Sequence, residues 1–112
     1  MVKFMITFRK PQNLPVFENA YNDFLALIER MPGITRRQVV TILGSPVGEA
    51  PYYRILEAYF ETLEKLEESL KSKAGQEAGS ELGRRFPGGT YEALFADVYE
   101  EEGGFTPLNS DR

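Results

Sequence analysis

The order of secondary-structure patterns between Pro51 and Glu102 constrains the fold of this 112-residue chain more than any other feature. A strand pattern over residues 52–60 is followed by an amphipathic helix pattern, and then by a second helix pattern that glycines interrupt. Another strand pattern covers residues 90–101. Two strands joined through helices in this way need a crossover above a sheet, so we expect a mixed α and β structure.

The first half of the chain follows the same order with a single helix. Residues 2–9 alternate between apolar and polar side chains, as in a half-buried strand. Apolar residues then recur at helical spacing from Phe17 until Pro32-Gly33, and residues 34–43 form a β-branched strand. The order βαββααβ with right-handed crossovers predicts an α+β fold of the ferredoxin-like type, with a four-stranded antiparallel sheet and helices on one face. We expect one domain over residues 1–102 and a C-terminal tail over residues 103–112.

Both faces of the predicted sheet are apolar. The more apolar face is expected to meet the helices, and its residues are Phe4, Ile6, Phe8, Leu56, Ala58, Phe60, Leu94, Ala96 and Val98. The opposite face still carries Met5, Tyr53, Ile55, Tyr59, Phe95 and Tyr99. This is too much apolar surface to leave in water, so the pattern predicts a homodimer in which two sheets face each other.

The composition excludes several classes of chemistry. The chain has no Cys and no His, which removes disulfides, thiolate metal sites and iron–sulfur ligation. No run of apolar residues is long enough for a membrane span, and we expect a cytoplasmic protein with no membrane partner. The net charge is −4, and residues 57–102 hold twelve acidic against five basic residues, which disfavours nucleic-acid binding. Without a phosphate-binding glycine loop or a spaced carboxylate loop, we expect no cofactor and no metal.

Several short motifs resemble the EthD-like family of the dimeric α+β barrel superfamily over roughly residues 2–101. They are Phe17 with Tyr21, Met31-Pro32-Gly33, Pro51-Tyr52-Tyr53, Ala58-Tyr59-Phe60 before the Leu63/Leu66 helix, Gly75-Gln76, and Gly88-Gly89 before the last strand. The resemblance implies a dimer whose sheets build a shared barrel. It also implies kinship with lactone isomerases, polyketide cyclases and monooxygenases. Members of the family often carry a His near the position of Tyr21, where this chain has Ala20, Phe24 and Leu25, and this difference argues against catalysis.

The candidate binding site is a cavity between the helices and the sheet. Its candidate ligand-binding residues are Phe4, Ile6, Phe8, Tyr21, Phe24, Arg54, Leu56 and Ala58. An apolar pocket with a few polar groups is typical of small-molecule sites, and here Tyr21 supplies a hydroxyl and Arg54 a cation. Tyr21 is also the candidate catalytic residue. The alternative is that these residues are simply the core, with Gly75, Gly79 and Gly83 allowing close packing of the helix on the sheet.

Two charged pairs offer weaker candidate sites. Glu57 and Asp97 are expected on the dimer-facing side of the sheet, where they act as acid and base or form ion pairs with Lys3 and Arg9. Arg36 and Arg37 lie on a strand expected at the sheet edge. They could bind an anion, but such residues more often protect an edge or pair with an acidic neighbour such as the run from Glu100 to Glu102.

Three hypotheses follow for the function. The leading one is a homodimer that binds a small, largely apolar metabolite, aromatic or carboxylated, in the cavity between the helices and the sheet. The second is a cofactor-free enzyme of lyase, isomerase or oxygenase type that acts in the same pocket. The third is a purely structural dimerisation module with no ligand.

Overall fold

A computed structural model describes residues 1–101, 103, 104 and 107 of the chain, and its element order is the predicted βαββααβ. The elements are β1 (Val2–Arg9), α1 (Leu14–Ile28), β2 (Arg36–Thr41), β3 (Tyr52–Phe60), α2 (Leu63–Lys71), α3 (Lys73–Arg85) and β4 (Tyr91–Asp97). The last strand is shorter than the predicted strand over residues 90–101. Most of the expected tail over residues 103–112, and Glu102 with it, lies outside the described residues.

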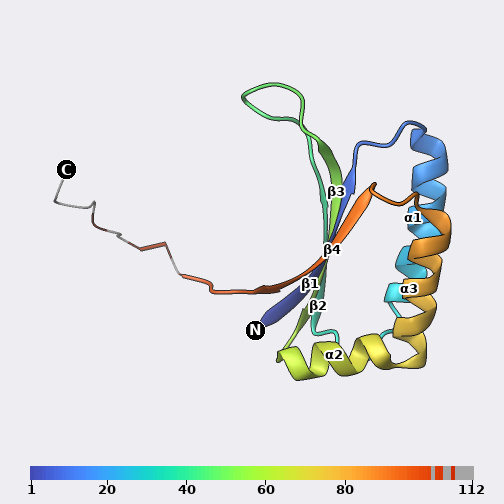
Figure 1. The fold of residues 1–112 in the computed structure, drawn as a ribbon. Helices are drawn as coiled ribbons and strands as arrows, with labels where there is room; N and C mark the ends of the chain where they lie inside the picture. The colour runs from blue at the N-terminus through green and yellow to red at the C-terminus, as the bar shows by residue number, and fades with distance from the viewer. Residues whose placement is uncertain (102, 105–106, 108–112) are drawn as a thin grey trace.

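The four strands form one antiparallel sheet in the order β2-β3-β1-β4, which confirms the ferredoxin-like α+β fold. All three helices lie on the same side of the sheet (Figure 1). There α1 and α3 run side by side, and α2 crosses one end of the sheet. Local capping defines the helix starts: the side chains of Asn13, Thr62 and Ser72 each accept a hydrogen bond from a backbone N–H in the first turn of their helix.

The core lies between the helices and the central strands β1 and β3. Alternate residues of these strands face the helices, as predicted, because Phe4 pairs with Ala58 and Ile6 with Leu56 across the sheet. The buried apolar residues are Ile6, Phe8, Phe17, Ala20, Tyr21, Phe24, Ile28, Met31, Leu56, Ala58, Phe60, Leu66, Ala78, Leu82 and Phe86. A single layer of side chains therefore joins the sheet to the helices.

The predicted face assignment of β4 is wrong. Phe4 pairs with Phe95 and Ile6 with Ala93, so these β4 residues share the helix-facing side. Leu94 and Ala96, which were expected there, pair with Met5 and Lys3 on the opposite side, called the open face below, and Val98 lies beyond the end of the strand. The strand is at an edge of the sheet and carries apolar residues on both faces, so alternation alone did not distinguish them. Phe95 remains 55% exposed beside Phe4.

An irregularity in the β1–β3 pairing moves Tyr53 to the helix side. The register shifts between Phe8, which pairs with Arg54, and Arg9, which pairs with Tyr52, so Tyr53 is an extra residue on β3. The sequence pattern placed the ring of Tyr53 on the open face. Its ring instead makes an edge contact with Phe17 of α1, with centroids 5.6 Å apart.

The three glycines of α3 have different roles, and only Gly75 is required by packing. A Cβ at Gly75 would lie 2.2 Å from the backbone oxygen of Ser69, because α2 and α3 meet here in a tight turn. At Gly79 and Gly83 a Cβ would meet nothing within 4 Å. The idea that all three allow close packing on the sheet is therefore wrong. No helix in the described part of the chain is long and apolar enough to cross a membrane.

Candidate ligand-binding site

The eight residues proposed from the sequence lie on the helix-facing side of the fold. Six of them, Ile6, Phe8, Tyr21, Phe24, Leu56 and Ala58, belong to the buried core, and Phe4 is half-buried beside it. Arg54 pairs with Phe8 across the sheet, so it lies on the same side, and it is also buried. These positions suit a packed core as well as a binding site. Which of the two they form depends on whether side chains fill the space between them.

Aromatic rings fill that space. Phe8 lies at the centre of an aromatic cluster made of Phe8, Phe17, Tyr21, Phe24 and Phe86. The ring centre of Phe8 is 5.0 Å from that of Phe86 and 5.6 Å from that of Tyr21. Edge and tilted contacts at these separations are favourable for aromatic pairs. The centre of the proposed cavity is thus occupied in this structure by side chains, chiefly by Phe86.

Phe86 is the functional candidate that sequence reasoning missed. It is not among the eight candidate residues proposed from the sequence. It caps the C-terminal end of α3 in an extended conformation and contacts Phe8, Phe17 and Phe24. Pro87-Gly88-Gly89 follows it, and Gly89 has a positive φ of 82°. The sequence feature that could have identified Phe86 is its position between a glycine-rich helix and a glycine turn.

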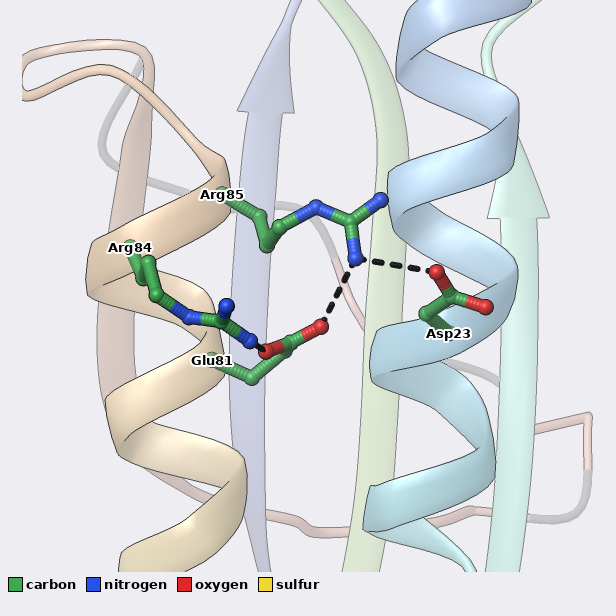
Figure 2. A network of polar contacts seen from close by, with 4 residues as sticks. All are labelled: Asp23, Glu81, Arg84 and Arg85. Atoms are coloured by element: carbon green, nitrogen blue, oxygen red, sulfur yellow. Dashed lines mark hydrogen bonds and ion pairs between the residues drawn. The ribbon is translucent and has the colours of Figure 1, made fainter.

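A network of ion pairs holds the end of α3 that carries Phe86. Arg85 bonds to Asp23 of α1 at 2.9 Å and to Glu81 of its own helix at 2.9 Å, and Arg84 also bonds to Glu81 (Figure 2). The pKa of Arg85 is raised, mainly by its hydrogen bond to Asp23. The network fastens α3 to α1 immediately before Phe86.

A polar group of three side chains, Arg54, Glu18 and Tyr53, adjoins the aromatic cluster near the start of β3. Both terminal nitrogens of the Arg54 guanidinium bond to the Glu18 carboxylate, with Nη2 3.0 Å from Oε2, and the Tyr53 hydroxyl donates to the same carboxylate at 3.4 Å. The guanidinium carbon lies 4.6 Å from the ring centre of Tyr21 and 5.6 Å from that of Phe17. Cations favour this position over an aromatic face. The Arg54 hydrogen bond holds the pKa of Glu18 below its ordinary value.

Two buried polar atoms in this region lack a hydrogen-bond partner. They are the hydroxyl oxygen of Tyr21 and the Nε of Arg54. Burial raises the pKa of Tyr21 to about 12, although the charge of Arg54 opposes the rise. The phenol is therefore neutral near pH 7 and able to donate a hydrogen bond. Buried polar groups nearly always find a partner, so unpaired donors on two adjacent side chains indicate a position for an acceptor atom.

The two surface hollows described in the structure lie outside the aromatic cluster. One of about 460 Å³ runs along α2 and is lined by Leu63, Glu64, Glu67, Glu68 and Lys71. The other, of about 370 Å³, lies under the β2–β3 loop and is lined by Lys10, Ile42, Leu43, Gly44, Glu49, Ala50, Tyr52 and Tyr53. Tyr53 connects the second hollow to the polar group, because its hydroxyl reaches Glu18.

The acid–base pair of Glu57 and Asp97 is wrong, since the two carboxylates lie on opposite faces of the sheet, whereas the alternative ion pair of Glu57 with Lys3 is formed. Asp97 pairs with Val2 on the helix-facing side, whereas Glu57 pairs with Met5 on the open face and forms an ion pair with Lys3. The described residues include no group of three or more carboxylates placed to hold a metal ion.

The edge position predicted for the arginine strand is confirmed. Arg37 pairs with Glu29 at 3.4 Å, and the guanidinium of Arg36 stacks 4.2 Å from the ring centre of Tyr59. Within one chain, the predicted pairing with Glu100 and Glu101 is not formed, because β2 and β4 are opposite edges of the sheet. Glu102 of that acidic run lies outside the described residues.

Comparison with solved structures identifies relatives that share this fold. An EthD family protein from Bacillus halodurans is 26% identical, covers 88% of this chain and 99% of its own, and superposes with a TM-score of 0.83. A hydroxynitrile lyase from Passiflora edulis is 16% identical over 91% of this chain and 96% of its own, with a TM-score of 0.69. A dimeric ferredoxin-like protein of unknown function from Jannaschia is 13% identical over 88% of this chain and 100% of its own, with a TM-score of 0.66. No protein-family model matches the sequence, and no curated protein sequence matches it significantly.

Proposed function

Because the chain is EthD-like and has the ferredoxin-like fold of the dimeric α+β barrel proteins, we propose that it binds a small apolar or aromatic metabolite between its helices and its sheet. The ligand contacts the aromatic cluster, and Tyr21 anchors its polar end. Phe4, Phe8 and Phe24 form walls of the site, and Ile6, Leu56 and Ala58 its floor. Arg54 lies at the polar end.

The unpaired hydroxyl of Tyr21 carries this proposal. An ordinary core tyrosine satisfies its hydroxyl, because an unmet buried donor costs about 1–3 kcal/mol. Here the hydroxyl is buried, and the guanidinium that lies over the Tyr21 ring, 4.6 Å from its centre, carries a second unmet donor, the Nε of Arg54. A ligand with one acceptor atom on an apolar body would satisfy the donors and keep the apolar surroundings.

Phe86 is the residue that makes room for the ligand. Its ring fills the middle of the aromatic cluster, and the Pro87-Gly88-Gly89 turn follows it directly. A Cβ at Gly88 or Gly89 would meet nothing within 4 Å, so the backbone there is free of close neighbours. We expect the ring of Phe86 to turn out of the core when a ligand enters and to close the empty site otherwise.

The second part of the proposal is a homodimer through the open face. Leu94 on this face is 45% exposed, and Met5 and Val40 are only half-buried there. Apolar residues on an exposed sheet face favour a covering partner. A fold relative from Jannaschia is described as dimeric, which supports the same assembly here.

A cofactor-free enzyme is the second candidate, and the protonation state of Tyr21 favours one version of it. A phenol whose pKa is about 12 is protonated near pH 7, so it is not available as a base. It can donate a proton or a hydrogen bond to a developing negative charge. The fold relative from Passiflora edulis is a hydroxynitrile lyase, so the scaffold is compatible with catalysis. In this version Tyr21 is the general acid of a lyase or isomerase reaction.

The test is a thermal-shift screen of the full chain against small aromatic aldehydes, ketones, alcohols and carboxylates. We expect at least one class to stabilise the wild type, and Tyr21→Phe to lose most of that effect. Tyr52→Phe is the matched control, because the Tyr52 hydroxyl donates to Glu92 at the surface, 3.2 Å away. If no compound stabilises the chain, the ligand-binding proposal fails and the dimerisation module is the better account. For a compound found this way, turnover that Tyr21→Phe leaves intact would remove the catalytic role.

A further inference from the structure

The charge of the buried Arg54 is already neutralised within the chain. Its side chain is only 10% exposed, whereas the side chain of its partner Glu18 is 38% exposed. The bidentate geometry and the hydroxyl of Tyr53 hold the carboxylate in place. The same hydrogen bond that lowers the pKa of Glu18 raises that of Arg54, so both groups are ionised near neutral pH. The pair presents no net charge to a ligand.

The donors that remain free next to this pair are suited to a neutral acceptor. Glu18 occupies both terminal nitrogens of the guanidinium and leaves Nε, which is buried and unpaired. The hydroxyl of Tyr21 is the other unpaired donor. A carbonyl oxygen has two lone pairs and no charge, and it can accept hydrogen bonds from two donors at once.

A carboxylate in this position would lack a counter-charge. It would add a second negative charge to a buried group that Glu18 has already balanced, and burying an unpaired charge is strongly unfavourable. The other nearby cation, Arg37, whose charge also acts on the Tyr21 hydroxyl, is paired with Glu29. Lys10, in the hollow under the β2–β3 loop, is paired with Glu49.

We infer that the ligand is a neutral carbonyl compound, an aromatic or apolar aldehyde, ketone or ester, and that Glu18 is the residue that excludes carboxylates. This inference rests on the proposed function and narrows it. The carbonyl oxygen accepts from the Arg54 Nε–H and from the Tyr21 hydroxyl, while Glu18 stays on the terminal nitrogens. Glu18 does not touch the ligand, so its role is to balance the positive charge of Arg54.

The experiment compares two probes of similar size and shape, acetophenone and benzoate, by NMR titration of the full chain at pH 7. In the wild type we expect acetophenone to bind at least about tenfold more tightly than benzoate, a difference of about 1.4 kcal/mol. In Glu18→Gln the side-chain shape is kept and the charge is removed, so we expect the preference to vanish or reverse through tighter benzoate binding. Glu29→Gln is the matched control, because Glu29 pairs with Arg37 and not with Arg54. It should keep the wild-type ratio.

The outcomes separate this inference from the proposed function. Equal binding of the two probes by the wild type overturns the inference and leaves the site intact. So does an unchanged ratio in Glu18→Gln, or the same change in Glu29→Gln. If neither probe binds saturably to the wild type or to Phe86→Ala, both the inference and the proposed function are overturned. The wild-type comparison needs no variant, so a folding defect in Glu18→Gln would not protect the inference.

Discussion

The rings of Phe8 and Phe86 lie with their centres 5.0 Å apart, at a tilt of 47°, and thereby join the central strand β1 to the end of α3. This contact closes the space that the sequence assigned to a ligand. It makes Phe86 both a core residue and the group that a ligand must displace. The stability and the binding of the protein are therefore coupled at one side chain.

Phe86→Ala should destabilise the fold and open the site. Replacing a buried phenylalanine by alanine typically costs about 3–5 kcal/mol, and Phe86 contacts three rings of the aromatic cluster. Urea unfolding measures the loss. The control is Phe95→Ala, which removes a ring that is 55% exposed and should cost less than about 1 kcal/mol. Equal losses for the two variants would show that Phe86 is not the closing residue of the core.

Alanine substitutions at Gly75 and Gly79 should act in opposite directions. In Gly75→Ala the new Cβ meets the backbone oxygen of Ser69, which cannot move away without distorting α2, so we expect a loss of about 2 kcal/mol or more. In Gly79→Ala the Cβ meets nothing within 4 Å, and the helix gains about 0.5–1 kcal/mol from the better helix former. Thermal unfolding of both variants decides the point. A stable Gly75→Ala protein would contradict the tight join of the two helices.

The open face should form the dimer interface. Leu94→Lys places a charge between the two facing sheets, so we expect it to shift the protein from dimer to monomer in analytical ultracentrifugation. Leu14→Lys is the matched control, because Leu14 is also 45% exposed but starts α1, away from the open face. It should leave the dimer intact. A monomeric wild type, or a dimeric Leu94→Lys variant, contradicts a dimer through this face.

The ion pair of Glu18 with Arg54 should stabilise the fold in a pH-dependent way. The pKa of Glu18 is lowered in the folded chain, chiefly by the hydrogen bond from Arg54, so the unfolded chain takes up this proton first. The contribution is complete above the ordinary pKa of 4.5 and is lost as the pH falls through the lower, folded value. The stability of Glu18→Gln should consequently approach that of the wild type as the pH is lowered from 7 to 3. Parallel stability curves for the two proteins would contradict this.

The sequence predicts the fold well because two kinds of periodicity agree over most of the chain. Alternation in β1 and β3 and helical spacing in α1 put Ile6, Phe8, Tyr21 and Leu56 into the core, as expected. Prediction fails where a residue's direction depends on its neighbours in space. Tyr53 reaches the helix side through an extra residue in the β1–β3 pairing. The faces of β4 are both apolar, so only the pairing of Phe4 with Phe95 decides which one meets the helices.

The candidate site is less predictable than the fold for the same reason. The sequence identifies Tyr21 and Arg54 as polar residues on an apolar side, but it does not show that Glu18 occupies the guanidinium or that Nε and the Tyr21 hydroxyl are left unpaired. Nor does helical spacing reveal that Phe86 ends its helix with its ring in the aromatic cluster. Those facts depend on distances between separate elements.

The most direct test of ligand binding beside Tyr21 is a measurement of intermolecular NOEs between acetophenone and the side chains of the full chain. The account predicts NOEs from the ligand to the rings of Tyr21 and Phe8, with the resonances of Phe86 shifted as its ring leaves the core. NOEs confined to the hollow along α2, to the hollow under the β2–β3 loop or to the open face would contradict it. So would the absence of any NOE at saturating ligand.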